Sequence, residues 1–201
     1  FAEYVDKGCP MVIGGPLAHV MAAKLVTLKE ANTPEFREYA ERVIENASTL
    51  ASACVDKGMR IATGGTDNHL FLLDVRPQGL TGRQAESALR ECGITLNRNS
   101  LPADPNGPWY TSGLRFGTAA LTSLGMDKKD MEKIASVIEK VIKNMKPSII
   151  ESGKNKGKQS RAKYTIDQNI IEEAKKEVKE IMEAKPLYPE LDLEFLEKHF
   201  G

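Results

Sequence analysis

A proline-rich loop that runs into a short strand, within residues 97–117, holds the residue types best suited to chemistry. Residues 102–108 contain three prolines and a Gly-Pro step, which exclude regular secondary structure and predict a shaped loop. Leu114 and Phe116 then alternate with Arg115, so a strand would bury both apolar side chains and turn the guanidinium to the opposite face. A guanidinium on a rigid strand suits bidentate binding of a carboxylate or phosphate. The alternative is a structural ion pair on a solvated face.

A second candidate site lies at residues 14–19, where Gly14, Gly15 and Pro16 precede an apolar run. Pro16 fits the first position of a helix, and the two glycines leave backbone N–H groups unobstructed. Free N–H groups at the positive end of a helix dipole can bind an anion. The alternative for Gly-Gly-Pro is a simple turn.

Composition argues against several classes of partner. The 201 residues include 28 basic and 28 acidic side chains, which gives no global electrostatic case for nucleic acid or an anionic membrane. No apolar run is long enough to span a membrane. Cys9, Cys54 and Cys92 lie far apart without Cys-x-x-Cys spacing, which favours buried thiols, a reducing compartment and no zinc site. Asp67 and His69 have the spacing of a metal pair but no third ligand nearby. We therefore expect a cytoplasmic protein without a metal, membrane or nucleic-acid partner.

The apolar pattern and the capping residues predict helices around a few short strands. Thr33 begins a long helix whose apolar stripe ends at residues 57–58, and Thr81 caps a later helix with Gln84 in the capping-box position. We expect strands at 59–62, 69–75, 94–97 and 114–116, a short helix at 118–121, and helices from 125–127 to Pro147, at 166–184 and within 191–197. This order predicts an α+β fold with a small, mainly antiparallel sheet covered by helices on one side.

Residues 151–163 differ in composition from the rest of the chain. They contain five basic residues, two glycines and no large apolar side chain, so burial cannot order them. We interpret them as a flexible basic insertion. The alternative is a contact with RNA or phosphate, although no aromatic residue occurs before Tyr164.

Four stretches match one protein family in the family's order. They are Gly-Gly-Pro-Leu-x-His and Ala-Ala-Lys within residues 14–24, Gly-Gly-Thr-Asp-Asn-His at 64–69, Leu-Thr-Gly at 80–82, and Gly-Ile-Thr-x-Asn-x-Asn through Thr-Ser-Gly-Leu-Arg at 93–115. On these motifs the chain resembles serine hydroxymethyltransferase over residues 10–147 and in a Pro-Leu-Tyr-Pro segment near its end. The resemblance implies the C-terminal domain of a fold-type I enzyme that uses pyridoxal phosphate (PLP). Such an enzyme interconverts serine and glycine and passes a one-carbon unit to or from tetrahydrofolate.

The resemblance also implies roles for individual residues. Arg115 would bind the carboxylate of the amino-acid substrate, and the backbone of Gly15 would contact the cofactor phosphate of a neighbouring subunit. The active site would then be shared in a homodimer or homotetramer. Four residues match positions that line the folate pocket, where an indole offers an aromatic face: Asn99, Gly107, Pro108 and Trp109.

The family's Thr-His-Lys motif, which carries the cofactor-binding lysine, does not occur in this sequence. PLP chemistry needs that lysine and a partner for the pyridinium nitrogen. We therefore expect a C-terminal fragment with no catalytic residue of its own and no activity alone. Residues 1–31 would be the end of the large PLP-binding domain, and residues 32–201 the small domain. The alternative is a non-catalytic folate- or protein-binding domain of the same fold.

Overall fold

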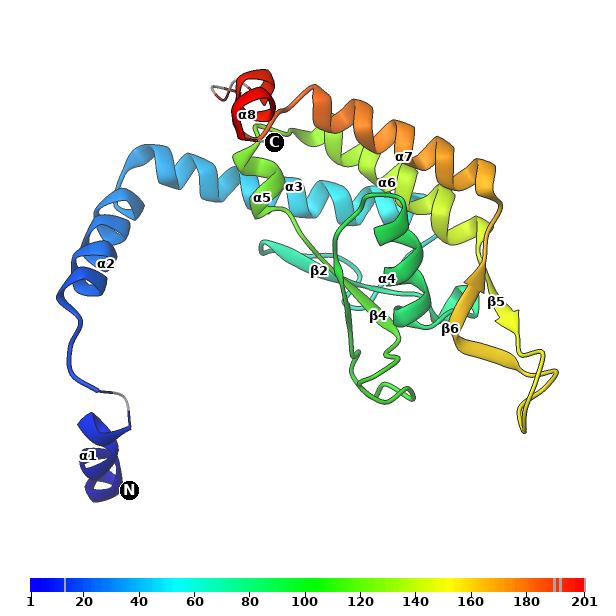
Figure 1. Cartoon of the computed structure of the whole chain (residues 1–201), viewed down its shortest axis with the longest axis horizontal. Helices are drawn as coiled ribbons and strands as arrows, with labels where there is room; N and C mark the ends of the chain where they lie inside the picture. The colour runs from blue at the N-terminus through cyan, green and yellow to red at the C-terminus, as the bar shows by residue number, and fades with distance from the viewer. Residues whose placement is uncertain (13, 190, 192, 201) are drawn as a thin grey trace. The chain divides into compact units, whose positions relative to one another are not determined.

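The chain divides into two compact units, residues 1–40 and 41–201. The computed structural model describes residues 1–12, 14–189, 191 and 193–200, and Figure 1 traces the elements of each unit. The division falls inside helix α3 (Pro34–Asp56).

The first unit consists of α1 (Ala2–Met11), α2 (Ala18–Ala31) and the start of α3. Two local expectations were wrong. Pro16 is not the first helical residue, because Leu17 keeps an extended backbone as N-cap and α2 begins at Ala18, two residues after Pro16. Cys9 lies inside α1 at a kink with φ −99° and ψ 116°, and it is exposed rather than buried.

The long helix α3 was predicted correctly at both ends. The Thr33 hydroxyl accepts a hydrogen bond from the Phe36 backbone N–H at 3.3 Å, and Gly58 follows the helix with a positive φ of 78°. The apolar stripe buries its second half, including Leu50 and Cys54. Burial raises the pKa of the Cys54 thiol to about 12, so this cysteine is an inert part of the core.

The second unit is built on a four-stranded antiparallel sheet in the order β1-β2-β4-β3. The strands are β1 (Arg60–Ile61), β2 (Leu70–Asp74), β3 (Asn97–Asn99) and β4 (Gly113–Gly117). The position predicted for the third strand, residues 94–97, was wrong, because β3 covers Asn97–Asn99. Ile94 still donates its N–H to the carbonyl of Leu89 in the preceding helix, at 2.9 Å, so pairing with β4 begins only at Asn97.

Helices cover the sheet. They are α4 (Gly82–Glu91), α5 (Ala119–Ser123), α6 (Lys128–Asn144) and α7 (Gln168–Glu183), with a short 3₁₀ helix at Arg76–Gln78. In Figure 1, α6 and α7 run beside each other above strands β2 and β4. The predicted capping box of Thr81 and Gln84 is confirmed at the start of α4. Buried apolar side chains of α3, α4, α6 and the sheet form one core, and the predicted α+β class is confirmed.

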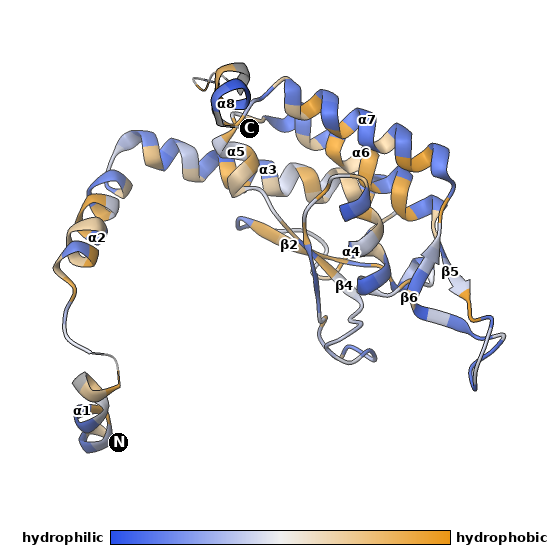
Figure 2. Ribbon diagram, in the orientation of Figure 1, coloured by the Kyte–Doolittle hydropathy of each residue, from blue (hydrophilic) through white to orange (hydrophobic). Residues whose placement is uncertain are grey.

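A second sheet was missed from the sequence. β5 (Lys146–Ile149) and β6 (Gln159–Thr165) pair as an antiparallel hairpin. Residues 159–163 are therefore a strand and not part of a flexible insertion, and Pro147 lies in β5 after α6 has ended at Asn144. β6 alternates exposed and half-buried residues although it is mostly hydrophilic, as Figure 2 shows. Pairing with β5 contributes to its order, and Tyr164 of β6 packs against the core.

The chain ends in α8 (Leu193–Phe200), close to the short helix expected at 191–197; Asp192, within that expectation, lies outside the described residues. Among the described helices, none has the length and apolar character needed to cross a membrane.

Candidate functional site

The Arg115 strand has the geometry that its sequence predicts. In β4, Leu114 and Phe116 are buried while Arg115 is exposed. Arg115 pairs across the sheet with Leu72 of β2 and Asn97 of β3, so its backbone is held from both sides. The guanidinium therefore projects from the centre of a rigid sheet.

The alternative of a structural ion pair finds no support in the described part of the chain. There, the Arg115 guanidinium takes part in no salt bridge and no side-chain hydrogen bond. Two other arginines beside this sheet are paired, since Arg60 and Arg76 both form salt bridges with Asp74. An unpaired guanidinium on a central strand leaves its donors available to an anion.

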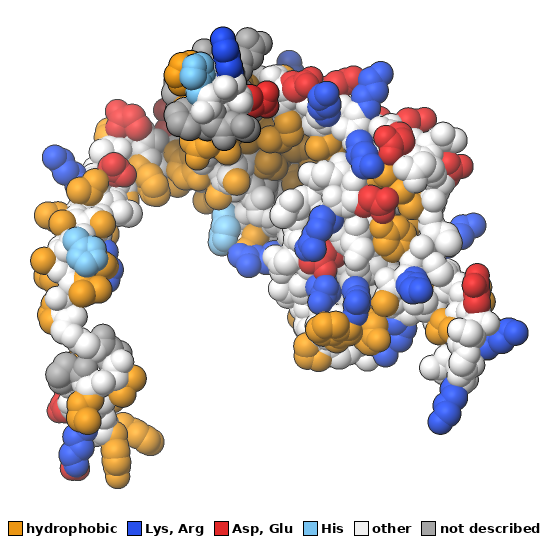
Figure 3. Space-filling model, viewed as in Figure 1, with side chains coloured by type: hydrophobic (Ala, Val, Ile, Leu, Met, Phe, Trp, Pro, Cys, Tyr) orange, Lys and Arg blue, Asp and Glu red, His pale blue; other side chains and the backbone are white. Residues whose placement is uncertain are grey.

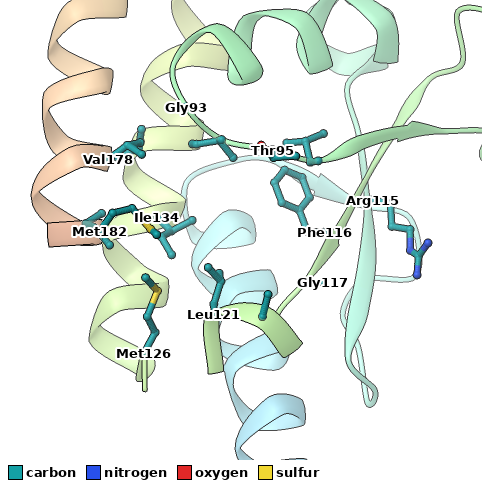
Figure 4. Close-up of a pocket in the computed structure, with 15 residues that line it drawn as sticks. Gly93, Thr95, Arg115, Phe116, Gly117, Leu121, Met126, Ile134, Val178 and Met182 are labelled. Atoms are coloured by element: carbon teal, nitrogen blue, oxygen red, sulfur yellow. The ribbon is translucent and has the colours of Figure 1, made fainter. Parts of the chain in front are cut away.

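An apolar cavity of about 320 Å³ lies on the other side of β4. Figure 4 shows Phe116 pointing toward this cavity and the Arg115 side chain pointing away from it. Its lining comes mainly from the segment before β3 and from α5, α6 and α7, and includes Ile94, Leu96, Leu121, Ile134 and Val178. Arg115 also borders the cavity, but its guanidinium points away from it and the other lining residues carry no charge, so the carboxylate site predicted from Arg115 would lie outside the cavity.

Asp104 organises the loop that precedes β4. One carboxylate oxygen accepts the backbone N–H groups of Leu101 at 3.0 Å and Ser112 at 2.8 Å. The other accepts the N–H of Asn106 at 2.9 Å and the Ser112 hydroxyl at 2.5 Å. Burial acts to raise the pKa of Asp104, but these hydrogen bonds outweigh it and hold the pKa below the ordinary value of 3.8. A single charged side chain thus closes the loop onto the start of the strand.

Helix α4 holds the same loop through its free N-terminal amides. The N–H groups of Gly82 and Arg83 donate to the carbonyls of Thr111 and Tyr110, at 3.1 and 2.9 Å. A Cβ on Gly82 would lie 2.3 Å from the Thr111 hydroxyl and 2.7 Å from the carbonyl of Gly113. Glycine is therefore required at this point of the Leu-Thr-Gly motif, because the backbone of the loop comes so close.

Thr111 is strained at this contact. Its φ is 54°, a value that a β-branched residue rarely adopts, and its buried hydroxyl has no hydrogen-bond partner among the described residues. Ala103, in the same loop, also has a positive φ of 52°. Backbone strain held in place by surrounding contacts is frequent at binding sites.

Trp109 lies at the surface of the loop, and the residue is 62% exposed. The guanidinium carbon of Arg83 stands 4.9 Å from the centroid of the indole ring, and that of Arg98 stands 5.6 Å away. Arg98 is also paired with Glu86, whereas Arg83 forms no salt bridge within the described residues. Figure 3 shows basic side chains gathered around an apolar patch at this end of the unit.

Comparison with known proteins places this arrangement in a family. The family model described as serine hydroxymethyltransferase matches residues 3–138, which include the Arg115 strand, its loop and α4. The chain belongs to the serine hydroxymethyltransferase family.

Curated relatives share the match along almost the whole chain. A serine hydroxymethyltransferase of Treponema pallidum (strain Nichols) is 54% identical over 200 residues, which are 100% of this chain and 34% of that protein. Serine hydroxymethyltransferases of Mycolicibacterium smegmatis and Chlamydia muridarum are 51% and 46% identical, over 96% and 98% of this chain and 38% and 39% of their own lengths. The chain thus spans roughly a third of the length of these relatives.

The residues that the resemblance to serine hydroxymethyltransferases assigned to folate fall into two groups. Asn99 ends β3 on the face of Arg115, since Asn97 and Asn99 alternate with Arg98, and its amide donates to the Ser100 carbonyl at 2.8 Å. The other group is the exposed turn of Gly107, Pro108 and Trp109. Its indole lies against Arg98, which points to the opposite face of β3.

Gly15 belongs to the first unit, outside the one that carries Arg115. Gly15 is exposed, and apart from its chain neighbours no atom lies within 4 Å of the point where a Cβ would stand. Its backbone is therefore open to a phosphate oxygen. One backbone donor fits a phosphate but does not hold a cofactor. The described residues of this member of the serine hydroxymethyltransferase family therefore fit PLP only as one part of a larger binding site.

The described residues contain no group of three or more His, Cys, Asp or Glu side chains that could hold a metal ion. Asp67 and His69 lie in the exposed turn region before β2, and His19 is exposed on α2.

The sequence interpretation missed Asp104, Ser112 and the arginines around Trp109. Asp104 carried a usable signal, because an aspartate between prolines in a loop often accepts backbone N–H groups two residues on. Arg83 and Arg98 gave no local signal, since they meet the indole only when α4 and β3 pack together.

Proposed function

We propose that this chain is the C-terminal part of a serine hydroxymethyltransferase, with residues 1–31 as the end of the large domain and residues 32–201 as the small domain. Such an enzyme interconverts serine and glycine and transfers a one-carbon unit to or from tetrahydrofolate. The family match and the relatives at about half identity support the proposal. PLP would be the cofactor of the longer protein, and its lysine and pyridinium partner would come from outside these residues.

One observation carries the assignment of the substrate site. The guanidinium of Arg115 is exposed on a central strand, held on both sides, and unpaired within the described residues. A fork of donors in this state binds a carboxylate in bidentate fashion. Arg115 is thus the residue proposed to bind and orient the carboxylate of serine or glycine.

The second part of the proposal concerns tetrahydrofolate. The exposed indole of Trp109 offers an aromatic face, next to the turn of Gly107 and Pro108. With Asn99 these residues are proposed to line the folate site. Gly15 is proposed to donate its backbone N–H to the cofactor phosphate of a neighbouring subunit in a homodimer or homotetramer, in the cytoplasm.

A direct assay tests this function. A protein that joins this chain to an N-terminal region carrying the family's Thr-His-Lys motif is expected to convert serine to glycine, with formation of 5,10-methylenetetrahydrofolate when PLP is present. The 201-residue chain alone is expected to be inactive. If the joined protein bound tetrahydrofolate but never converted serine, the alternative of a non-catalytic folate-binding domain would replace the proposal.

A further inference from the structure

The β5–β6 hairpin is fastened to the start of α4 by side chains of the capping box. The Gln84 amide donates to the carbonyls of Ser160 at 2.7 Å and Lys163 at 2.9 Å, and the Thr81 hydroxyl donates to the carbonyl of Arg161 at 2.8 Å. Gln84 is fully buried, so these bonds are shielded from water. The backbone of β6 therefore has a fixed position beside the loop that α4 also holds.

Arg161 reaches from this fixed backbone onto the loop. Its guanidinium carbon stands 4.3 Å from the centroid of the Tyr110 ring, and its Nη2 donates to the Asn106 side-chain oxygen at 2.5 Å. The Asn106 amide in turn donates to the Ser112 hydroxyl at 2.9 Å. Arg161 is thus connected to both the aromatic residues and the hydrogen-bonded base of the loop.

The contacts continue to Trp109 as an alternating stack of arginine and aromatic side chains. Arg83 stands 6.0 Å from the Tyr110 ring and 4.9 Å from the Trp109 ring, and Arg98 completes the stack at 5.6 Å from the indole. We call these five residues the arginine–aromatic stack: Arg161, Tyr110, Arg83, Trp109 and Arg98. They come from β6, the loop, α4 and β3, so the orientation of the indole depends on four separate segments.

From this geometry we infer that Arg161 is a positioning residue, which sets the orientation of Trp109 for its ligand through Tyr110 and Asn106. The inference rests on the proposed function for the ligand, a folate. The match to the family model ends at Ile138, before the hairpin begins. The hairpin therefore adds a contact to the loop that the matched region does not contain, and Arg161 would tune folate binding in this protein and in relatives that share the hairpin.

Trp109 is the only tryptophan of the chain, so its fluorescence reports on the stack directly. In the 201-residue chain without ligand, Arg161→Met is expected to raise quenching of Trp109 by acrylamide. The same substitution is expected to weaken binding of the probe 5-formyltetrahydrofolate by about two- to fivefold, the factor that corresponds to an exposed cation–π contact. Arg161→Lys is expected to restore only part of the protection of Trp109 from acrylamide and only part of the probe affinity, because lysine lacks the planar fork of arginine.

The matched control is Lys163→Met, which removes a positive charge from the same face of β6, two residues along. It is expected to change neither quenching nor probe affinity. Tyr110→Leu removes the ring that lies between Arg161 and Arg83 and is expected to reproduce the effect of Arg161→Met, so it carries the test if the first variant does not fold.

Two failures are distinguishable. If Arg161→Met and Tyr110→Leu left the acrylamide quenching of Trp109 as in the unmodified chain, the positioning role of Arg161 would be wrong, whatever the affinity for folate. If the unmodified chain bound no 5-formyltetrahydrofolate, the proposed folate site would be wrong, while the quenching comparison without ligand would still decide whether Arg161 positions the indole.

Discussion

At the scale of single residues, the candidate site depends on a carboxylate that touches no proposed ligand. Asp104 accepts hydrogen bonds from Leu101, Asn106 and Ser112, and without it the N–H groups of a tight turn would lose their common acceptor. Hydrogen bonds to a charged group stabilise more than those to a neutral one. The conformation of the loop therefore depends on the ionised form of the Asp104 carboxyl group.

Asp104→Asn tests this dependence. At pH 7 the variant is expected to lose about 1 to 3 kcal/mol of unfolding free energy, measured by urea denaturation. The pKa of Asp104 in the folded chain is lowered from 3.8. Its contribution to the unfolding free energy is therefore fully present above pH 3.8 and disappears as the pH falls through the lowered pKa of the folded chain. The difference in unfolding free energy between the variant and the unmodified chain should therefore be smaller at pH 3 than at pH 7. An equal difference at both pH values would contradict the role assigned to the Asp104 carboxylate.

Residue-level prediction succeeded where the signal was local. Arg115 between Leu114 and Phe116 defines a strand with one apolar face, and the structure confirms that alternation. The role of Ser112 could not be predicted, because its hydroxyl meets Asp104 only through the fold of the loop. Whether Asn99 and Trp109 serve one folate site stays a prediction.

At the scale of elements, α4 fixes the loop through close approach. Its N-terminal N–H groups donate hydrogen bonds to the carbonyls of Tyr110 and Thr111, and the loop lies so close to Gly82 that there is no room for a side chain at this position. The same helix anchors the hairpin through Gln84 and Thr81. One helix terminus thus positions two segments that are distant in the sequence.

Gly82→Ala is expected to destabilise the second unit by about 1 to 3 kcal/mol, because the added methyl group meets backbone and cannot be accommodated by rotating a side chain. The expected result is a lower thermal midpoint and a red-shifted Trp109 emission as the loop moves. Gly65→Ala is the control, since nothing lies within 4 Å of its Cβ position. Equal midpoints for the two variants would show that the loop is not held against α4 as described.

Element prediction failed where order comes from a partner strand or from packing. The basic composition of residues 151–163 predicts a flexible segment, yet β6 is ordered by β5 and by the capping box of α4. Conversely, Ile94 and Leu96 have strand-like character but pack against the core as α4 ends. The capping box itself was predictable, because Thr81 and Gln84 are three residues apart.

At the scale of the whole molecule, the two units differ in how their helices are stabilised. Within the first unit, none of residues 1–9, 11–12 and 14–31 is buried, whereas α6 buries Met131, Ala135, Val137 and others in the core of the second unit. Large apolar side chains of α2, including Leu25 and Leu28, are exposed. A helix without tertiary packing is only marginally stable in water.

Hydrogen exchange of the 201-residue chain measures this difference. Backbone amides of α2 are expected to exchange about 100-fold or more faster than those of α6, because only α6 must open against the core. The two helices have comparable lengths, 14 and 17 residues, which makes the comparison a fair one. Equal protection would mean that α2 is packed in solution.

The central claim is that Arg115 binds the carboxylate of the amino-acid substrate. It is tested by the affinity for glycine of the PLP-loaded, full-length protein, followed by the absorbance of the bound cofactor. Arg115→Ala is expected to weaken glycine binding about 100-fold, which corresponds to loss of a charge-assisted bidentate pair. Arg90→Ala, an exposed arginine on α4, serves as control and should bind glycine normally. An Arg115→Ala protein that binds glycine as tightly as the unmodified enzyme would contradict the account.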